Sequence, residues 1–281
     1  MMPEFHVAGW IDAFVDWLLL SYGALFDGIS AGILALLLRI QAGLEWLPWW
    51  AAVAITILAA YSLTRRPGLS LILGSLLVMV VAFGLWPLAV ETLAVVIASV
   101  VLALLLGIPV GVLMAESRWA NAALQPVLDA MQTMPSFVYL IPAMMLFGLG
   151  KVPAVLATLI YSTPPVIRLT NLGIRQVSPE VQEAALAYGA TRWQLLKEVR
   201  LPLAMPSILA GVNQTTMMAL SMVVIASMIG ARGVGEEVLL AINRIDVGRG
   251  FEAGLAIVAL AIVMDRLTQA FARRWETPGV P

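Results

Sequence analysis

The longest segments without a charged residue set the strongest limit on how this chain can fold. The segment from Leu201 to Ala231 contains 31 residues and not one Asp, Glu, Lys or Arg. Glu91 alone interrupts residues 67–115, and Glu45 alone interrupts residues 40–64. About 20 apolar residues are enough for a helix to cross the roughly 30 Å of hydrocarbon in a bilayer. Segments of this length therefore predict helices embedded in a membrane.

The composition agrees with this prediction and excludes several classes of protein. The 281 residues are 61% hydrophobic and 12% charged, whereas soluble domains are roughly 45–50% apolar and about 25% charged. The chain has no Cys, which excludes a disulfide framework and a thiolate metal site. Its one His, His6, lies in the N-terminal tail, and the predicted spans contain no paired carboxylates, so enzyme catalysis has little to build on. The net charge of −1 gives no indication of nucleic-acid binding.

We predict an all-α membrane protein with about seven transmembrane helices. The predicted spans cover residues 46–63, 69–86, 88–115, 134–150, 152–170, 203–230 and 252–271. The fourth is short and contains Pro135 and Pro142, so its start is predicted to be broken or re-entrant. The predicted organisation is an N-terminal interfacial helix with two accessory spans (1–87), a core (88–272) and a cytoplasmic tail (273–281).

Residues 10–39 have a polar stripe on an otherwise apolar helix. At helical spacing, one side carries Asp12, Asp16, Gly23, Asp27 and Ser30. Such a stripe predicts an amphipathic helix that lies in the membrane interface. The alternative is a true span that packs its acidic stripe against neighbouring helices. Residues 1–38 contain no Lys or Arg, so the positive region of a signal peptide is missing.

The placement of Lys and Arg predicts the orientation in the membrane. With seven spans, one side receives eleven cations and the other receives five, which are Arg39, Lys151, Arg232, Arg244 and Arg249. Because Lys and Arg accumulate in cytoplasmic loops, the side with eleven is predicted to be cytoplasmic. The C-terminus then lies inside and the N-terminus outside. If residues 10–39 span the membrane, the N-terminus moves inside and the other assignments stand.

The polar loop at residues 171–202 contains signals for two short helices. Ser178-Pro179-Glu180 is typical of a helix start, and Gly189 can adopt the left-handed conformation that ends a helix. Thr191 and Gln194 have the spacing of a capping box, so a second helix is predicted to begin there and to end before Pro202. The elbow, residues 178–202, either docks a partner protein or is a solvated connector.

The elbow also carries a resemblance to a known family. Glu183-Ala184-Ala185, three residues, Gly189, nine residues, Val199, one residue and Leu201-Pro202 resemble the EAA signature of ABC importer permeases, in which Ile usually takes the place of Val199. Residues 131–142, 163–175 and 213–226 resemble the permeases of the glycine betaine/proline betaine family. The resemblance covers about residues 88–272.

This resemblance implies a type I importer permease in a bacterial cytoplasmic membrane. It implies a homodimer that works with two ATPase subunits and an extracytoplasmic substrate-binding protein. The coupling residues that it implies are Glu183, Ala184, Ala185, Gly189, Leu201 and Pro202. We expect ATP and Mg²⁺ on the partner ATPase and no cofactor in this chain, because Gly148-Leu-Gly150-Lys151 lacks the upstream glycine and the hydroxyl of a phosphate-binding loop.

The expected solute is glycine betaine or a related quaternary-ammonium compound. Choline, proline or another amino acid is the alternative, since the EAA signature belongs to the whole superfamily. An ion-coupled secondary transporter is a further alternative, but such proteins usually show inverted repeats and carboxylates at mid-membrane, and neither is found in this sequence.

Aromatic and polar residues in the apolar spans are candidates for the translocation path, because quaternary amines bind aromatic faces. They are Phe137, Tyr139, Tyr161, Asn213, Gln214 and Thr215. Hydrogen bonding between helices is an equal alternative for them. Glu91, Asp129 and Asp265 are candidates for gating, although interhelical pairing is the commoner role of such groups. Gly107 and Gly111 predict close helix packing or a hinge.

Overall fold

The computed structural model describes residues 8–273, and the described residues form helices joined by short connections, with no strand among them. His6 and residues 274–281 of the predicted tail lie outside the described residues. The N-terminal helices are α1 (Ala8–Glu45), α2 (Trp49–Thr64), α3 (Pro67–Ala82), α4 (Trp86–Glu116) and α5 (Arg118–Thr133). Next come the 3₁₀ turn η1 (Ser136–Tyr139), α6 (Leu140–Phe147), α7 (Lys151–Arg175), α8 (Pro179–Ala187) and α9 (Arg192–Gln194). The chain ends with η2 (Leu195–Arg200), α10 (Leu201–Ser221), α11 (Val223–Ser227), α12 (Val234–Arg244) and α13 (Val247–Ala272).

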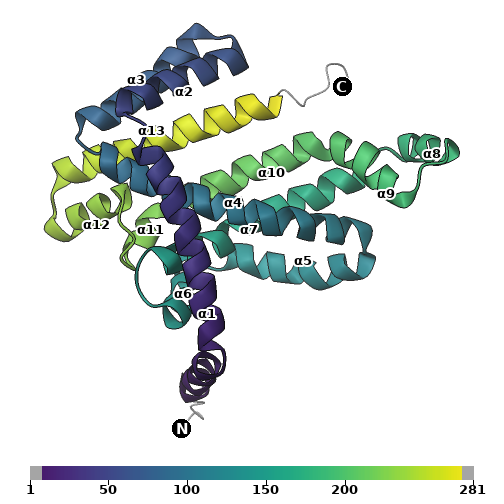
Figure 1. Ribbon diagram of the computed structural model, residues 1–281, viewed down its shortest axis with the longest axis horizontal. Helices are drawn as coiled ribbons and strands as arrows, with labels where there is room; N and C mark the ends of the chain where they lie inside the picture. The colour runs from purple at the N-terminus through teal and green to yellow at the C-terminus, as the bar shows by residue number, and fades with distance from the viewer. Residues whose placement is uncertain (1–7, 274–281) are drawn as a thin grey trace.

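The centre of the molecule is a set of three closely packed helices, α4, α7 and α10 (Figure 1). Small residues allow this contact. A Cβ atom on Gly111 of α4 would lie 2.7 Å from the carbonyl oxygen of Ile167 in α7. A Cβ atom on Gly211 of α10 would lie 3.1 Å from the Cα of Val166. The predicted packing role of Gly111 is therefore confirmed, and the α4 helix continues through Pro109 without interruption.

Four helices of residues 8–273 are long and apolar enough to cross a membrane: α1 from Gly9, α4, α7 and α13. The predicted spans 88–115, 152–170 and 252–271 correspond to the last three. The predicted span 203–230 is divided into α10 and α11. Helix α10 has 21 residues, but polar residues such as Asn213 and Gln214 lower its mean hydropathy, so it is not among these four.

The predicted span 134–150 is not a straight helix. Its residues form η1 and α6, and together with α5 they make a pair of helices bent by 112°. Pro135 precedes the bend, in an extended conformation with φ −58° and ψ 138°. Since proline cannot donate the backbone hydrogen bond that a continuous helix needs, the break predicted for this segment is confirmed.

The predicted spans 46–63 and 69–86 correspond to α2 and α3, which have 16 residues each. A helix of this length measures about 24 Å, which is less than the roughly 30 Å of a hydrocarbon core. The two helices form a hairpin against α13, and their shared core includes Leu73, Leu77, Ala256 and Leu260. Only Arg65 and Arg66 separate them, and Arg65 adopts a left-handed conformation with φ 56°.

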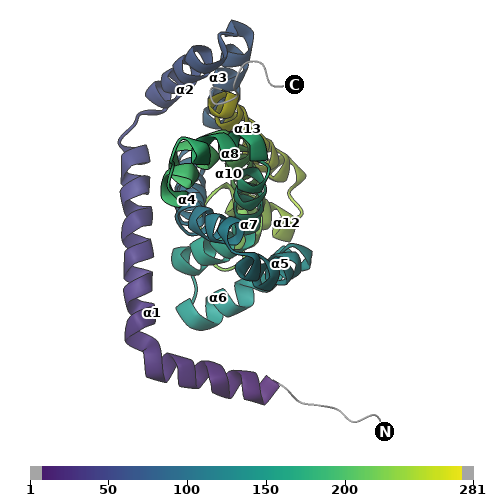
Figure 2. The same ribbon diagram turned by 90° about the vertical axis from the view of Figure 1, so that its right-hand side faces the viewer.

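The N-terminal helix α1 crosses the bundle instead of running along it (Figures 1 and 2). Non-helical angles at Tyr22 (φ −126°, ψ 18°) divide it, and Figure 2 shows a sharp bend between the two parts. The continuous stripe predicted from Asp12 to Ser30 is therefore wrong, because the kink separates its two ends. The second part buries only Ile33 and Leu37 against α4 and α7. By length and composition α1 also meets the criterion for a span.

Candidate functional site

The elbow has the conformation that the sequence predicts for its first half. Helix α8 ends in a turn in which the Gly189 N–H donates to the Leu186 carbonyl (2.9 Å) and the Ala190 N–H donates to the Ala185 carbonyl (3.1 Å). Gly189 has φ 86°, a value that favours glycine because it lacks a Cβ atom. The Thr191 N–H donates to Gln194 Oε1 (2.9 Å), and the Gln194 N–H donates to Thr191 Oγ1 (3.3 Å), so the predicted capping box is confirmed.

The second half of the elbow differs from the prediction. The helix does not end before Pro202, because η2 is a π-helical segment that continues directly into α10. The Leu201 N–H donates to the Leu196 carbonyl, which is the i to i−5 pattern of a π-helix. Pro202 occupies the first turn of α10, where its missing N–H is tolerated. The elbow and α10 are therefore one continuous helical arm.

The elbow extends beyond the ends of the central helices (Figure 1). Its surface carries large apolar side chains. No residue of α8 is buried. Tyr188 is 95% exposed and Trp193 is 68% exposed. Exposed aromatic side chains in a polar loop are typical of binding surfaces. Sequence reasoning missed these two residues, although two aromatics among charged neighbours gave a signal for them.

Polar contacts fasten the elbow to the central helices. Just before the elbow, Arg175 at the end of α7 donates to the carbonyl oxygen of Met114 in α4 (2.7 Å), which joins the two central helices to each other. Arg200, at the end of η2, forms an ion pair with Glu116 at the end of α4. Leu195 and Leu196 are buried, and Leu201 packs against the cluster that contains Leu196. Among the predicted coupling residues, Glu183, Ala184, Gly189 and Pro202 are exposed, whereas Ala185 and Leu201 are half-buried.

The six path candidates come from η1, α7 and α10 and differ in exposure. The rings of Tyr139 and Tyr161 have centroids 6.0 Å apart, and the Tyr139 hydroxyl donates to the Met131 carbonyl. Phe137 is 58% exposed, and Gln214 is exposed as well. Thr215 is buried, with no hydrogen-bond partner for its hydroxyl among the described residues. The aromatic candidates therefore belong to η1 and α7, and the polar candidates belong to α10.

Asn213 takes part in hydrogen bonds between α10 and α13. Its Nδ2 donates to Asp265 Oδ1 (3.0 Å), and its Oδ1 accepts from the Thr268 hydroxyl. Gln269 Nε2 donates to the same Asp265 oxygen (2.7 Å). For Asn213 the alternative of interhelical hydrogen bonding is therefore confirmed. Asn213 and Gln214 also line a cavity of about 310 Å³ between α10 and α13, together with Gln269 and Arg273.

The other ionisable groups also make interhelical pairs. Glu91 Oε2 of α4 lies 3.0 Å from Lys151 Nζ of α7, and Lys151 Nζ also donates to Gln41 Oε1 of α1 (2.9 Å). Asp129 of α5 pairs with Arg168 of α7. Glu91 and Asp129 therefore make interhelical ion pairs, which is the commoner of the two roles considered for them.

Comparison with known proteins identifies the family. The model of the binding-protein-dependent transport system inner membrane component matches residues 107–277. The chain belongs to this family. The glycine betaine/carnitine transport permease protein GbuB of Listeria monocytogenes is 45% identical over 97% of this chain and 98% of its own. The glycine betaine transport system permease protein OpuAB of Bacillus subtilis is 44% identical over 95% of each chain.

Solved structures agree with the fold. An inward-facing structure of the MetNI methionine ABC transporter is similar with a TM-score of 0.61 and 19% identity, over 66% of this chain and 94% of that one. The predicted all-α fold of a type I importer permease is confirmed. The chain is thus an inner membrane transport component of a binding-protein-dependent system, and not an enzyme. Membership of this family also implies ATPase and substrate-binding partners for the chain.

Proposed function

We propose that this chain is the permease subunit of an ATP-driven importer for glycine betaine or a related quaternary-ammonium solute. The observation that carries the proposal is an exposed helix–glycine–helix elbow, bearing the EAA signature, that continues without a break into α10. Two relatives that cover nearly the whole chain at 44% and 45% identity are named for glycine betaine transport, which supports the solute class. ATP and Mg²⁺ belong to the partner ATPase in this proposal.

In the proposed mechanism the elbow transmits the movement of the ATPase to the membrane helices. Glu183, Ala184, Ala185 and Gly189 present α8 and its turn to the ATPase, and the small Ala side chains allow a close approach. Leu201 and Pro202 join the elbow to α10. Because η2 and α10 are continuous, and because Arg200 pairs with Glu116, a displacement of α8 is passed to both α10 and α4. Both of these helices pack against α7 in the centre of the molecule.

The proposed orientation places the elbow and the C-terminus in the cytoplasm and the N-terminus outside. The last turns of α13 point toward the same end of the molecule as α8 (Figure 1). The segments assigned to this side by the sequence contain eleven of the 16 Lys and Arg residues. In this arrangement α1 lies along the outer interface across α4 and α7. The absence of Cys permits a direct test. Ala13→Cys, Asn243→Cys and Ala187→Cys are made one at a time, and labelling of each by a membrane-impermeant maleimide is measured in intact cells. Labelling of Ala187→Cys from outside intact cells would contradict this orientation.

We further propose that residues 88–272 form the permease core of a homodimer. Phe137 and Gln214 lie at the surface of the single chain, so a passage that they line needs a second surface to close it. A second copy related by two-fold symmetry supplies such a surface. Mass measurement of the active complex in detergent tests this part. One permease chain per active complex would contradict the homodimer.

The solute is tested by ATP-dependent uptake into proteoliposomes that hold the permease, its ATPase and its binding protein. Labelled glycine betaine, choline and proline are compared in the same preparation. We expect uptake of glycine betaine to exceed that of proline and to require ATP. Uptake of proline or another amino acid with no uptake of either quaternary amine would contradict the betaine assignment while leaving the importer assignment in place.

The coupling role is tested with Glu183→Lys and Gly189→Asp. With either variant, we expect the assembled complex to hydrolyse ATP without transport, or the permease to lose its binding of the ATPase. Matched controls are Glu180→Lys, another charge reversal on α8, and Gly84→Asp, which places the same side chain at another positive-φ glycine with open space around it. Transport at the wild-type rate in both elbow variants would falsify the coupling role.

A further inference from the structure

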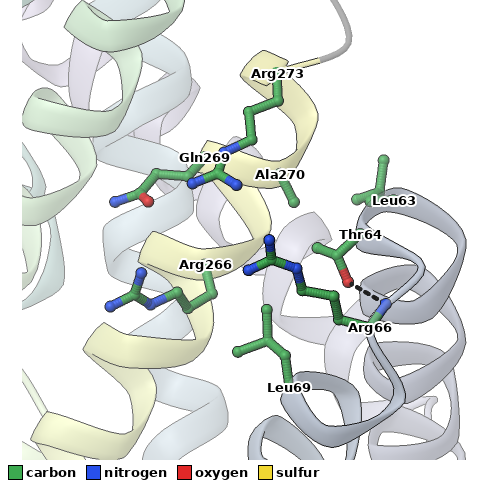
Figure 3. Close-up of a pocket in the computed structure, with 8 residues that line it drawn as sticks. All are labelled: Leu63, Thr64, Arg66, Leu69, Arg266, Gln269, Ala270 and Arg273. Atoms are coloured by element: carbon green, nitrogen blue, oxygen red, sulfur yellow. Dashed lines mark hydrogen bonds between the residues drawn. The ribbon is translucent and has the colours of Figure 1, made fainter.

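A cavity of about 280 Å³ lies between the turn that joins α2 to α3 and the last turns of α13. Its lining residues come from these two places and are drawn in Figure 3: Leu63, Thr64, Arg66, Leu69, Arg266, Gln269, Ala270 and Arg273. None of them belongs to the elbow or to the six path candidates. Gln269 and Arg273 also line the cavity that contains Asn213 and Gln214. The mechanism proposed above assigns no task to any of the eight lining residues, and the inference below does not depend on which solute is carried.

The lining is strongly cationic. It contains three arginines and no acidic residue. The nearest acid to Arg266 is Asp265, whose Oδ2 lies 3.8 Å from Arg266 Nε, and Asp265 already accepts hydrogen bonds from Asn213 and Gln269. Arg66 and Arg273 have no acidic partner among residues 8–273. Cations gathered without counter-charges favour the binding of an anion.

The directions of the side chains identify the two arginines whose guanidinium groups lie nearest each other in the cavity. Figure 3 shows Arg66 reaching from the start of α3 toward α13, and Arg273 folded back along α13 toward Gln269. Arg266 extends toward the opposite side of α13. The backbone turn that holds Arg66 is fixed by two hydrogen bonds. The Arg65 N–H donates to the Tyr61 carbonyl (2.8 Å), and the Arg66 N–H donates to Thr64 Oγ1 (3.3 Å).

The cavity is also apolar on one side, where Leu63, Leu69 and Ala270 line it. A guanidinium group is planar and presents several donors, which matches a phosphate group. Basic pockets between membrane helices on the cytoplasmic side typically hold phospholipid headgroups. The combination of guanidinium groups with leucine side chains suits an amphiphile that has a phosphate and the start of an acyl chain.

We propose that this cavity binds a phosphate-bearing anion, with Arg66 and Arg273 as its cationic contacts. The headgroup of an anionic phospholipid is one source of such a group, and free phosphate is another. Either ligand would join the α2–α3 hairpin to α13 by neutralising arginines that approach from both sides. The site thus links the hairpin that precedes the family match to the core of the permease.

The experiment compares the assembled complex in nanodiscs of phosphatidylcholine alone, in nanodiscs with added phosphatidylglycerol, and in phosphatidylcholine with added inorganic phosphate. Native mass spectrometry counts retained phosphatidylglycerol, and thermal unfolding reports stabilisation by either ligand. The test variant is Arg66→Gln/Arg273→Gln. The control is Arg118→Gln/Arg244→Gln, which removes the same charge from two exposed arginines outside the cavity. Arg66→Lys/Arg273→Lys keeps the charge and removes the planar donors.

We expect the Gln variant to bind phosphatidylglycerol roughly tenfold more weakly or worse, since each cation near an anionic headgroup contributes about 1 kcal/mol. The Lys variant should lie between, and the control should match the wild type. Stabilisation by inorganic phosphate alone, lost in the Gln variant, would support the site with free phosphate as its ligand. The proposal would be overturned if the Gln variant and the control retained equal amounts of phosphatidylglycerol and were stabilised equally by both ligands. Thermal unfolding of the control without ligand is the reference for folding of the Gln variant.

Discussion

Arg200, the last residue of η2, forms an ion pair with Glu116, the last residue of α4. The elbow continues into α10, and this ion pair joins it to a second central helix, α4. The side chain of Arg200 is 14% exposed, whereas that of Glu116 is 39% exposed. Because burial makes an unpaired charge costly, the two partners are not equivalent, and loss of Glu116 leaves the more buried charge without a partner.

This asymmetry gives the first prediction. Glu116→Gln should lower the free energy of unfolding by about 2 kcal/mol, whereas Arg200→Gln should lower it by about 1 kcal/mol. Both variants should raise the number of ATP molecules hydrolysed per solute imported, since α4 loses its link to the elbow. The measurements are thermal unfolding of the complex and paired ATPase and uptake assays. The exchange Glu116→Arg/Arg200→Glu should recover part of both losses, and a lack of any recovery would argue against the ion pair.

The second prediction concerns the contact between α4 and α7. Gly111→Ala would place a Cβ atom 2.7 Å from the Ile167 carbonyl oxygen and 2.6 Å from Thr170 Cβ, both closer than real contacts allow. We expect it to destabilise the protein by about 1–3 kcal/mol through overpacking. Gly43→Ala is the control, because it lies in a helix with nothing within 4 Å, and there alanine should be neutral or slightly stabilising. Equal midpoints of thermal unfolding for both variants would show that α4 and α7 lie further apart.

The third prediction concerns the aromatic residues of the elbow. Tyr188→Ala and Trp193→Ala should each weaken binding of the partner ATPase by roughly tenfold, since exposed aromatic side chains frequently carry most of the energy of an interface. Neither side chain is buried in the chain alone, so folding should not change. Binding is measured by titrating the ATPase onto the permease in nanodiscs. Trp46→Ala is the matched control, because Trp46 is 85% exposed and lies in the connection between α1 and α2, outside the elbow. Affinities equal to that of the control would remove these residues from the interface.

Local chemistry explains which parts of the fold the sequence predicts well. The turn at Gly189 and the capping box at Thr191 depend on neighbouring residues alone, and both agree with the prediction. The break near Pro135 is also local, since it follows from the missing proline N–H. Helix α4 is similarly clear, because its 31 residues are far more apolar than a soluble helix would be.

Long-range contacts explain what the sequence leaves open. The direction in which α1 crosses the bundle is set by Ile33 and Leu37. These two residues pack against Val95 and Val155, which are distant in the sequence. The kink at Tyr22 has no proline beside it, and the neighbouring Ser21 and Gly23 do not by themselves distinguish a kink from a continuous helix. In the site, Asn213 has the same polarity whether it lines a path or bonds to Asp265, so only the approach of α13 distinguishes the two roles. The continuation of η2 into α10 replaces the expected stop at Pro202 for a similar reason, since buried Leu195 and Leu196 hold the arm in place.

The final prediction concerns the attachment of α1. Lys151 joins three helices, because its Nζ lies 3.0 Å from Glu91 Oε2 and donates to Gln41 Oε1 at 2.9 Å. The side chains of Lys151 and Glu91 are 25% and 19% exposed, so neither charge is fully hydrated. Lys151→Met should therefore leave Glu91 partly buried without its counter-charge and release α1, at a cost of about 1–3 kcal/mol.

A disulfide between Ile33→Cys and Val155→Cys, in the otherwise Cys-free chain, reports whether α1 remains in place. We expect its rate of formation to fall several-fold in the Lys151→Met background. Gln41→Leu, which removes only the neutral partner, should have a smaller effect than Lys151→Met, because the ion pair remains. The exchange Glu91→Lys/Lys151→Glu should restore the pairing. If the disulfide forms equally fast in Lys151→Met and in the wild-type background, apolar packing around Leu37 holds α1 without help from the ion pair.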